Sequence, residues 1–125
     1  MTKLADAAPV EIDDASVEEF LLSGEKATFL MFYGSQCLEC DDISPEWNQL
    51  AEAWDGHAHG QIAQVDCDKE ESMGICEYFH IQTLPTLVYG GSQQWDFYTG
   101  DSDYESLAAF AKESISKPIC SAHVP

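Results

Sequence analysis

Arginine is absent from this sequence of 125 residues, and only five lysines oppose 23 acidic residues, which gives a net charge of −18. A nucleic acid partner is therefore not expected, because phosphate binding needs a basic surface. An anionic membrane surface is not expected as a partner for the same reason. The acidity favours solubility and partners that are basic or neutral.

Long apolar runs are also missing. No stretch approaches the roughly 18 apolar residues of a membrane-spanning helix. The N-terminal segment MTKLADAAPVEIDD has one lysine and lacks the apolar core of a signal peptide. We therefore expect either a cytosolic protein or a mature or excised domain whose signal has been removed.

Cysteine, in contrast, is present at an intermediate level. Five cysteines are many for a cytosolic protein of this size and too few for a miniprotein built on disulfides. The length suits one domain with one hydrophobic core, and a hydrophobic content of 45% is that of a folded protein. Cys37 and Cys40 have CxxC spacing, and the others are Cys67, Cys76 and Cys120.

The hydrophobic pattern alternates between strands and helices. A continuous apolar run over residues 27–34 predicts a strand buried on both faces. Helical spacing follows from Cys37 to about Trp54, with Pro45 inside the helix. The order predicts an α/β fold with helices on both faces of a central sheet. The other predicted elements are a helix over 16–24 capped by Ser16 and ended by Gly24, a strand over 61–68, a helix over 71–81, a hairpin of 86–91 and 94–100 turning at Gly90 and Gly91, and a last helix over 104–115.

A CxxC between a buried strand and a helix is well placed for redox chemistry. The thiol of Cys37 would lie at a helix N-terminus, where free amides and the helix dipole favour the thiolate. The thiolate is the reactive form of cysteine. Cys40 would lie in the first turn, near enough to close a disulfide and to resolve a mixed disulfide.

Two other interpretations of the cysteines remain open at this point. The pair could be two inert buried thiols, or half of a zinc site. A zinc site would need a second ligand pair, and Cys67 and Cys76 are too far apart in sequence for a second CxxC knuckle. We expect His57 and His59 to lie in a solvated loop and not to bind metal, and we expect no cofactor.

Two segments resemble the thioredoxin-fold oxidoreductases, especially the domains of protein disulfide isomerases. In FLMFYGSQCLECDDISPEW, an aromatic-rich strand runs into CxxC, and Pro45 follows the first cysteine by eight residues, as in that family. QTLPTLVYG resembles the family's cis-proline loop, and YTGDSDYESLAAFAKESI resembles its last strand end and C-terminal helix. The resemblance covers roughly residues 16–115. It implies a thioredoxin fold, with a central mixed sheet flanked by helices on both faces.

The resemblance also implies roles for individual residues. Cys37 is the expected nucleophile and Cys40 the resolving thiol. Pro85 is the expected cis residue, although the residues alone would favour a trans bond. In the family the backbone before this proline pairs with an extended substrate, so Leu84 is a binding candidate. Gln36 stands where the family usually has tryptophan and is expected to contact substrate with less apolar surface.

Besides Gln36, three further positions depart from the family pattern. Met31 replaces the buried acid that usually lies six residues before the first cysteine, and Gln64 replaces the lysine often paired with it. Proton transfer from Cys40 would then use water or another group, and slower turnover is expected. Glu39 replaces the histidine of the isomerases, so we expect a higher Cys37 pKa and a more reducing couple, because a like charge opposes the thiolate.

The arrangement VDC…C of Cys67 and Cys76 resembles isomerase domains with a structural disulfide in this loop, though the interval of nine residues is somewhat long. Two free buried cysteines are the alternative. A formed bridge would favour an oxidising compartment. Cys120 has no expected role beyond a free thiol or a link between chains.

Together these observations predict a disulfide isomerase-like oxidoreductase that exchanges disulfides with protein substrates. The alternatives are a cytosolic thioredoxin-like reductase and a substrate-binding or chaperone module with weak redox activity. A monomer is expected, in the endoplasmic reticulum lumen or another secretory compartment, with the cytoplasm as the alternative. The expected organisation is an N-terminal extension with a possible first strand over 1–15, a thioredoxin-like domain over 16–117, and a tail over 118–125.

Overall fold

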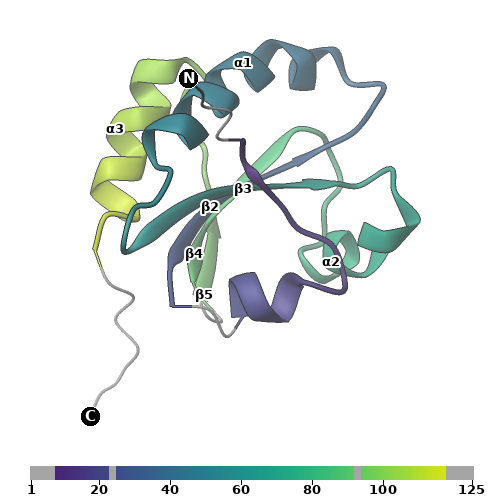
Figure 1. Ribbon diagram of the computed structural model, residues 1–125. Helices are drawn as coiled ribbons and strands as arrows, with labels where there is room; N and C mark the ends of the chain where they lie inside the picture. Colours follow the sequence, from purple (N-terminus) through teal and green to yellow (C-terminus); the bar gives the residue numbers. More distant parts are fainter. Residues whose placement is uncertain (1–7, 23–24, 92–93, 118–125) are drawn as a thin grey trace, which may run out of the picture.

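The computed structural model describes residues 8–22, 25–91 and 94–117 of the chain. Gly24, the expected helix end, and Cys120 in the tail lie outside these residues. Within them, the chain folds into a five-stranded sheet with helices on both faces (Figure 1). The predicted α/β class, with a thioredoxin fold and a mixed sheet, is confirmed.

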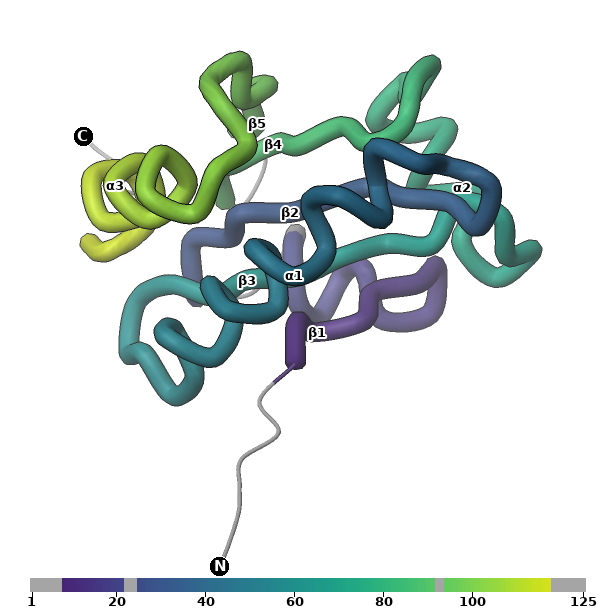
Figure 2. The backbone as a smooth tube through the Cα atoms, turned by 90° about the horizontal axis from the view of Figure 1, so that it is seen from above, coloured from purple at the N-terminus to yellow at the C-terminus, as the bar shows by residue number. Residues whose placement is uncertain are grey.

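The sheet has the strand order β1-β3-β2-β4-β5. β2 lies at its centre. It is parallel to β3, to which a helical crossover connects it, and antiparallel to β4, which pairs with its other edge. Figure 2 shows β1 and β5 at opposite edges of the sheet. Its strands are β1 (Val10–Glu11), β2 (Ala27–Tyr33), β3 (Gly60–Asp66), β4 (Thr86–Gly91) and β5 (Gln94–Phe97).

Two layers of helix cover the sheet (Figure 1). The helices α1 (Leu38–Ala53) and α3 (Tyr104–Ser114) lie on one face. A short π-helical segment, Glu18–Leu22, and α2 (Met73–Tyr78) lie on the other. Alternate side chains of β2 point into the two layers, with Phe29 and Met31 toward α1 and Leu30 and Phe32 toward α2. This double burial explains why the strand is a continuous apolar run.

The larger core is built around α1. Trp47 is fully buried, and its ring meets the edge of Phe29 at a centroid distance of 4.8 Å. The Trp47 indole N–H donates to the Ala63 carbonyl at 3.1 Å, which ties the helix to β3. Such an aromatic pair contributes about 0.5–1.5 kcal/mol beyond its buried area. The α1 axis is therefore fixed against the sheet, and so is the helix N-terminus that carries the CxxC.

The expected Ser16 cap is wrong. The side chain of Asp13 takes that role, because its Oδ1 accepts from the backbone N–H groups of Ala15 and Ser16 at 3.1 and 3.0 Å. The Ser16 hydroxyl oxygen instead accepts from the Asp13 N–H at 3.1 Å. Asp13 therefore begins the turn that leads into the helix, as an Asx turn, and the Ser16 side chain bonds back to Asp13 and not forward to the helix amides.

The expected hairpin turn at Gly90 and Gly91 is also misplaced. Both glycines belong to β4, and Gly90 pairs with Trp95 of β5. Gly90 has φ +149°, and a Cβ there would lie 2.1 Å from the Gln94 carbonyl oxygen. The glycine is therefore required by a close approach of two strands, and the residues that join the strands, 92–93, lie outside those described.

Candidate active site

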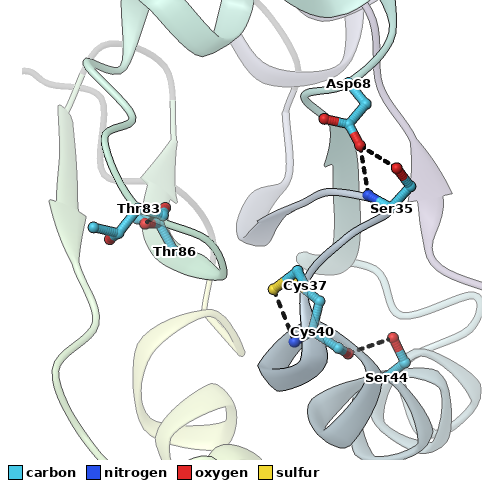
Figure 3. The surroundings of a disulfide bond; sticks show 7 residues. All are labelled: Ser35, Cys37, Cys40, Ser44, Asp68, Thr83 and Thr86. Atoms are coloured by element: carbon cyan, nitrogen blue, oxygen red, sulfur yellow. Dashed lines mark hydrogen bonds between the residues drawn. A yellow bond between two sulfur atoms is a disulfide. The ribbon is translucent and has the colours of Figure 1, made fainter.

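Cys37 and Cys40 are joined by a disulfide at the N-terminus of α1, with an S–S distance of 2.15 Å. Cys37 is the N-cap residue and has an extended backbone, which lets the chain pass from the loop after β2 into the helix. Its Sγ accepts from the Cys40 N–H at 3.0 Å (Figure 3). The sulfur thus lies where a free helix amide would also stabilise a thiolate.

The two sulfurs differ in access. Cys37 is half-buried, whereas Cys40 is 2% exposed and belongs to the core. An attacking or departing thiol can therefore reach Cys37, and Cys40 is restricted to reaction within the pair. Pro45 lies inside α1 and has no N–H for the carbonyl of Asp41, the residue four positions earlier.

Leu38, which was assigned no role from the sequence, is 83% exposed between the two cysteines. Gln36, on the other side of Cys37, is also exposed. An exposed leucine at the first position of a helix is an apolar contact beside the reactive sulfur. It offsets part of the apolar surface lost when Gln36 takes the place of tryptophan. In the sequence, the indication of an exposed Leu38 was its place in an acidic segment, with Glu39, Asp41 and Asp42 close behind it.

The Leu84–Pro85 peptide bond is cis. Both residues line a groove of about 610 Å³ beside the N-terminal end of α1. The groove brings the loop before β4 together with α1 and the loop before α3, so Leu84 and Pro85 lie near the CxxC segment. The lining residues are Glu39, Asp42, Ile43, Glu46, Thr83, Leu84, Pro85, Ser102 and Asp103.

This groove is acidic. Glu39, Asp42 and Glu46 follow one another at spacings of three and four along α1, so they form a stripe on one face of the helix. Asp103 contributes a fourth carboxylate, and its hydrogen bonds from the Ser106 side chain and backbone lower its pKa. None of the lining residues is basic. The surface next to the CxxC therefore has a negative potential.

Tyr33, at the end of β2, takes part in a polar cluster that the sequence analysis missed. Its hydroxyl donates to Glu11 Oε2 at 2.8 Å, and Gln64 Nε2 donates to the same oxygen at 2.6 Å. Burial, followed by the hydrogen bond and charge of Glu11 and the charge of Asp66, raises the Tyr33 pKa well above its ordinary value. Only the register of β1, β2 and β3 brings these residues together.

A second disulfide joins Cys67 and Cys76, with an S–S distance of 2.09 Å. It links the loop after β3 to α2. Both cysteines line a second groove, of about 490 Å³, together with Met73, Ile81 and Leu84 among others. Leu84 thus borders both grooves, and the second disulfide lies on the same side of the molecule as the cis-proline loop.

The histidines of the 57–59 loop make local contacts. His57 Nδ1 accepts from the backbone N–H groups of His59 and Gly60 at 3.0 and 3.1 Å, and its ring packs on Trp54. In the part of the chain that is described, no three His, Cys, Asp or Glu side chains gather closely enough to hold a metal ion. None of the described helices has the length and apolarity needed to cross a bilayer.

Comparison with known proteins agrees with this geometry. The chain is 31% identical over 112 residues to protein disulfide-isomerase erp38 of Neurospora crassa, which covers 87% of this chain and 30% of the relative. It is 28% identical over 116 residues to a mitochondrial thioredoxin domain-containing protein of Schizosaccharomyces pombe, covering 88% of the chain and 31% of the relative. The chain thus spans about a third of the length of these curated relatives.

A solved structure, the J-Trx1 fragment of ERdj5, matches 86% of the chain and 50% of its own length, with a TM-score of 0.75 and 28% identity. The thioredoxin family model matches residues 8–113, so the match includes β1 as well as both disulfides and the cis-proline loop. The chain belongs to the thioredoxin family.

Proposed function

We propose that this chain is a thiol–disulfide oxidoreductase domain of the protein disulfide isomerase kind, with Cys37 and Cys40 as its redox pair. The observation that supports it most directly is the difference between the two sulfurs. Cys37 is accessible and accepts a hydrogen bond at a helix N-terminus, and its bridged partner Cys40 is 2% exposed. This is the arrangement that an attacking thiolate and a resolving thiol require.

The exchange transfers two electrons between the protein and its substrate. In the reducing direction, the Cys37 thiolate attacks one sulfur of a substrate disulfide, which forms a mixed disulfide and releases the other substrate sulfur as a thiolate. Cys40 then loses its proton and attacks Cys37 Sγ. The Cys37–Cys40 disulfide forms, and the second substrate sulfur leaves and takes up a proton. Oxidation of a substrate dithiol is the reverse sequence.

Leu84, Pro85 and Gln36 are the proposed substrate contacts. The cis bond and the groove support this role for Leu84 and Pro85. Gln36 is exposed next to Cys37 but does not line the groove. We therefore expect it to contact a part of the substrate that lies outside the groove. The substrates we propose are extended protein segments that carry a thiol or disulfide and are basic around it, because the groove has four carboxylates and no cation.

An oxidising secretory compartment, such as the endoplasmic reticulum lumen, is the proposed location. The Cys67–Cys76 disulfide supports it, since structural disulfides persist in such compartments and are rare in the cytosol. The proposed domain boundaries remain those expected from the sequence, at 16–117, with the possible first strand in the N-terminal extension. Val10–Glu11 of the N-terminal extension pairs with β3 and so belongs to the sheet.

A binding or chaperone module with weak redox activity is the second candidate. It is favoured by the pairing of Met31 with Gln64, because neither side chain can take the proton that Cys40 must lose. Under this alternative the grooves would bind an unfolded segment, and the CxxC would contribute little turnover.

Insulin reduction by wild type, Cys37→Ser and Cys40→Ser decides between the candidates. We expect turnover by wild type alone, and Cys40→Ser should accumulate a mixed disulfide with substrate, because the resolving thiol is gone. Ser44→Ala is the control and should keep wild-type turnover, because it removes a hydroxyl that donates to the Cys40 carbonyl and leaves both cysteines in place. Background turnover in wild type and all variants would leave only the binding module.

A further inference from the structure

The loop before the CxxC is held by an aspartate from another part of the chain. Asp68 Oδ2 accepts from both the backbone N–H and the hydroxyl of Ser35, each at 2.5 Å (Figure 3). Ser35 lies two residues before Cys37, and Asp68 lies in the loop after β3. One carboxylate oxygen therefore fixes both the backbone and the side chain of the residue that leads into the redox pair.

Gly34 shows how tightly the same segment is enclosed. A Cβ at this position would lie 2.7 Å from Leu84 Cδ1 and 3.3 Å from Asp68 Oδ2. The chain entering the CxxC is thus packed between the cis-proline loop and the Asp68 loop. A shift of Asp68 would be transmitted to Ser35 by the two hydrogen bonds, beside a Gly34 that has no room for a side chain.

Asp68 is itself anchored on its N-terminal side. The preceding residue, Cys67, is bonded to Cys76 of α2, and its N–H donates to the Tyr33 carbonyl at 2.9 Å. The Asp68 N–H donates to Asp66 Oδ1 at 3.0 Å. A covalent bond and two hydrogen bonds therefore hold the backbone from which the Asp68 carboxylate reaches Ser35, although the side chain is exposed to solvent.

We propose that Asp68 is a positioning residue for the Cys37–Cys40 pair and that the Cys67–Cys76 disulfide holds it in place. The inference rests on the proposed function and gives the second disulfide a role in the first. The two hydrogen bonds from Ser35 lower the Asp68 pKa, so the carboxylate is ionised and accepts from Ser35 at neutral pH. Small displacements of a reacting atom are costly in rate, with about 1 Å costing up to about 100-fold.

The first test measures the reaction of the reduced protein with the aromatic disulfide 5,5′-dithiobis(2-nitrobenzoate), at alkaline pH where the rate no longer rises with pH. At this plateau the Cys37 thiol is fully ionised, so the rate no longer depends on the thiolate fraction, and a change in the intrinsic nucleophilicity of the thiolate follows its pKa only weakly. We expect Asp68→Ala to lower the plateau rate about tenfold. Asp68→Asn keeps an acceptor oxygen and should stay within about threefold of wild type.

Glu70→Gln is the matched control, because it removes an exposed acid two residues after Asp68, at the start of a 3₁₀ turn (Glu70–Ser72), and keeps the Glu70 carbonyl that accepts from the Met73 N–H. Its plateau rate should equal that of wild type. A wild-type plateau rate in Asp68→Ala, or an equal loss in Glu70→Gln, would overturn the positioning role. A check of the far-ultraviolet spectrum and denaturant midpoint excludes a global loss of structure as the cause.

The role of the second disulfide is tested by placing Asp68→Ala in a Cys67→Ser/Cys76→Ser background. If the disulfide holds Asp68, the background alone should slow the plateau rate several-fold, and adding Asp68→Ala should cost less than about threefold more, since coupled changes are not additive. If Asp68→Ala lowers the plateau rate tenfold in the Cys67→Ser/Cys76→Ser background, as it does in wild type, the disulfide does not hold Asp68.

A spectroscopic readout separates this inference from the proposed function. The Ser35 amide proton, hydrogen-bonded to a carboxylate, should resonate downfield in wild type and move upfield in Asp68→Ala but not in Glu70→Gln. This test and the small-disulfide reaction need no protein substrate. The insulin assay can therefore contradict the proposed function while these two tests support the positioning role of Asp68. Insulin reduction by wild type with no effect of Asp68→Ala in these tests would be the opposite result.

Discussion

Met31 and Gln64 are direct partners across the parallel pair of β2 and β3. The disulfide isomerases that this sequence resembles usually have an acid and a lysine there. Met31 is 1% exposed and packs in the core with Trp47, whereas Gln64 donates to Glu11 at the sheet edge. The site of a buried ion pair is therefore occupied by an apolar side chain and by an amide that is bonded elsewhere.

Restoring the acid alone should destabilise the protein. We expect Met31→Glu to lower the free energy of unfolding by about 3 kcal/mol or more, because a buried carboxyl without a partner is costly. Met31→Glu/Gln64→Lys should recover part of that loss and speed insulin reduction. Urea unfolding is the measurement, and Met31→Leu, which conserves volume, is the control at less than about 1.5 kcal/mol. Wild-type stability in Met31→Glu would show that water already reaches this site.

Replacing Glu39 should change the redox couple. Glu39→His removes a negative charge beside the helix N-terminus, so the Cys37 thiol should become more acidic and the disulfide more oxidising. We expect the equilibrium constant with glutathione to shift about three- to tenfold. Glu39→Gln should give a smaller shift in the same direction. No shift in either variant would mean that solvent screens Glu39 from the sulfur.

The sequence predicted what depends on local pattern and on neighbouring residues. The apolar run of β2 and the helical spacing after Cys37 located the strand and helix that hold the CxxC. The resemblance predicted that Met31 and Gln64 are paired, and they are partners in the register of β2 and β3. Ser16 was assigned the wrong role because Asp13, also a capping residue, stands three positions earlier.

What the sequence did not reveal depends on contacts between distant segments. Asp68 and Ser35 are 33 residues apart, and only the order β3-β2 in the sheet brings their loops together. Glu11 and Tyr33 meet for a similar reason, across the β3 strand that separates β1 from β2. No periodicity or spacing signals such a pair before the topology is known.

Loss of the second disulfide should lower stability. Cys67→Ser/Cys76→Ser should cost about 2–3 kcal/mol in free energy of unfolding, the value for a short closed loop. The denaturant midpoint of the oxidised protein should fall accordingly, and prior reduction should lower the wild-type midpoint by more than that of the variant, which has only the Cys37–Cys40 disulfide to lose. A variant as stable as wild type would show that α2 is held by its apolar contacts alone.

Stability should fall at alkaline pH through Tyr33. The folded-state pKa of Tyr33 is raised, first by burial and then by Glu11, so its contribution to stability is complete below the unfolded value of about 10 and is lost as pH rises above it. The denaturant midpoint should therefore decline above about pH 10. Tyr33→Phe should remove part of that decline, and Glu11→Gln a smaller part. An identical decline in Tyr33→Phe would assign it to other groups.

The acidic groove should make exchange depend on the charge of the substrate. A peptide disulfide flanked by lysines should react about tenfold faster at low salt than one flanked by glutamates, because the groove attracts cations, and the difference should shrink as salt is added. Asp42→Asn/Glu46→Gln should weaken the preference by removing two carboxylates of the α1 stripe.

The matched control for this preference is Glu52→Gln/Asp55→Asn, which removes two exposed acids at the other end of α1. It changes the net charge equally, so it distinguishes the field of the groove from the field of the whole molecule. If both double variants weaken the preference to the same extent, the net charge of −18 is responsible and the groove is not. If only Asp42→Asn/Glu46→Gln weakens it, the groove selects basic segments around the substrate sulfur.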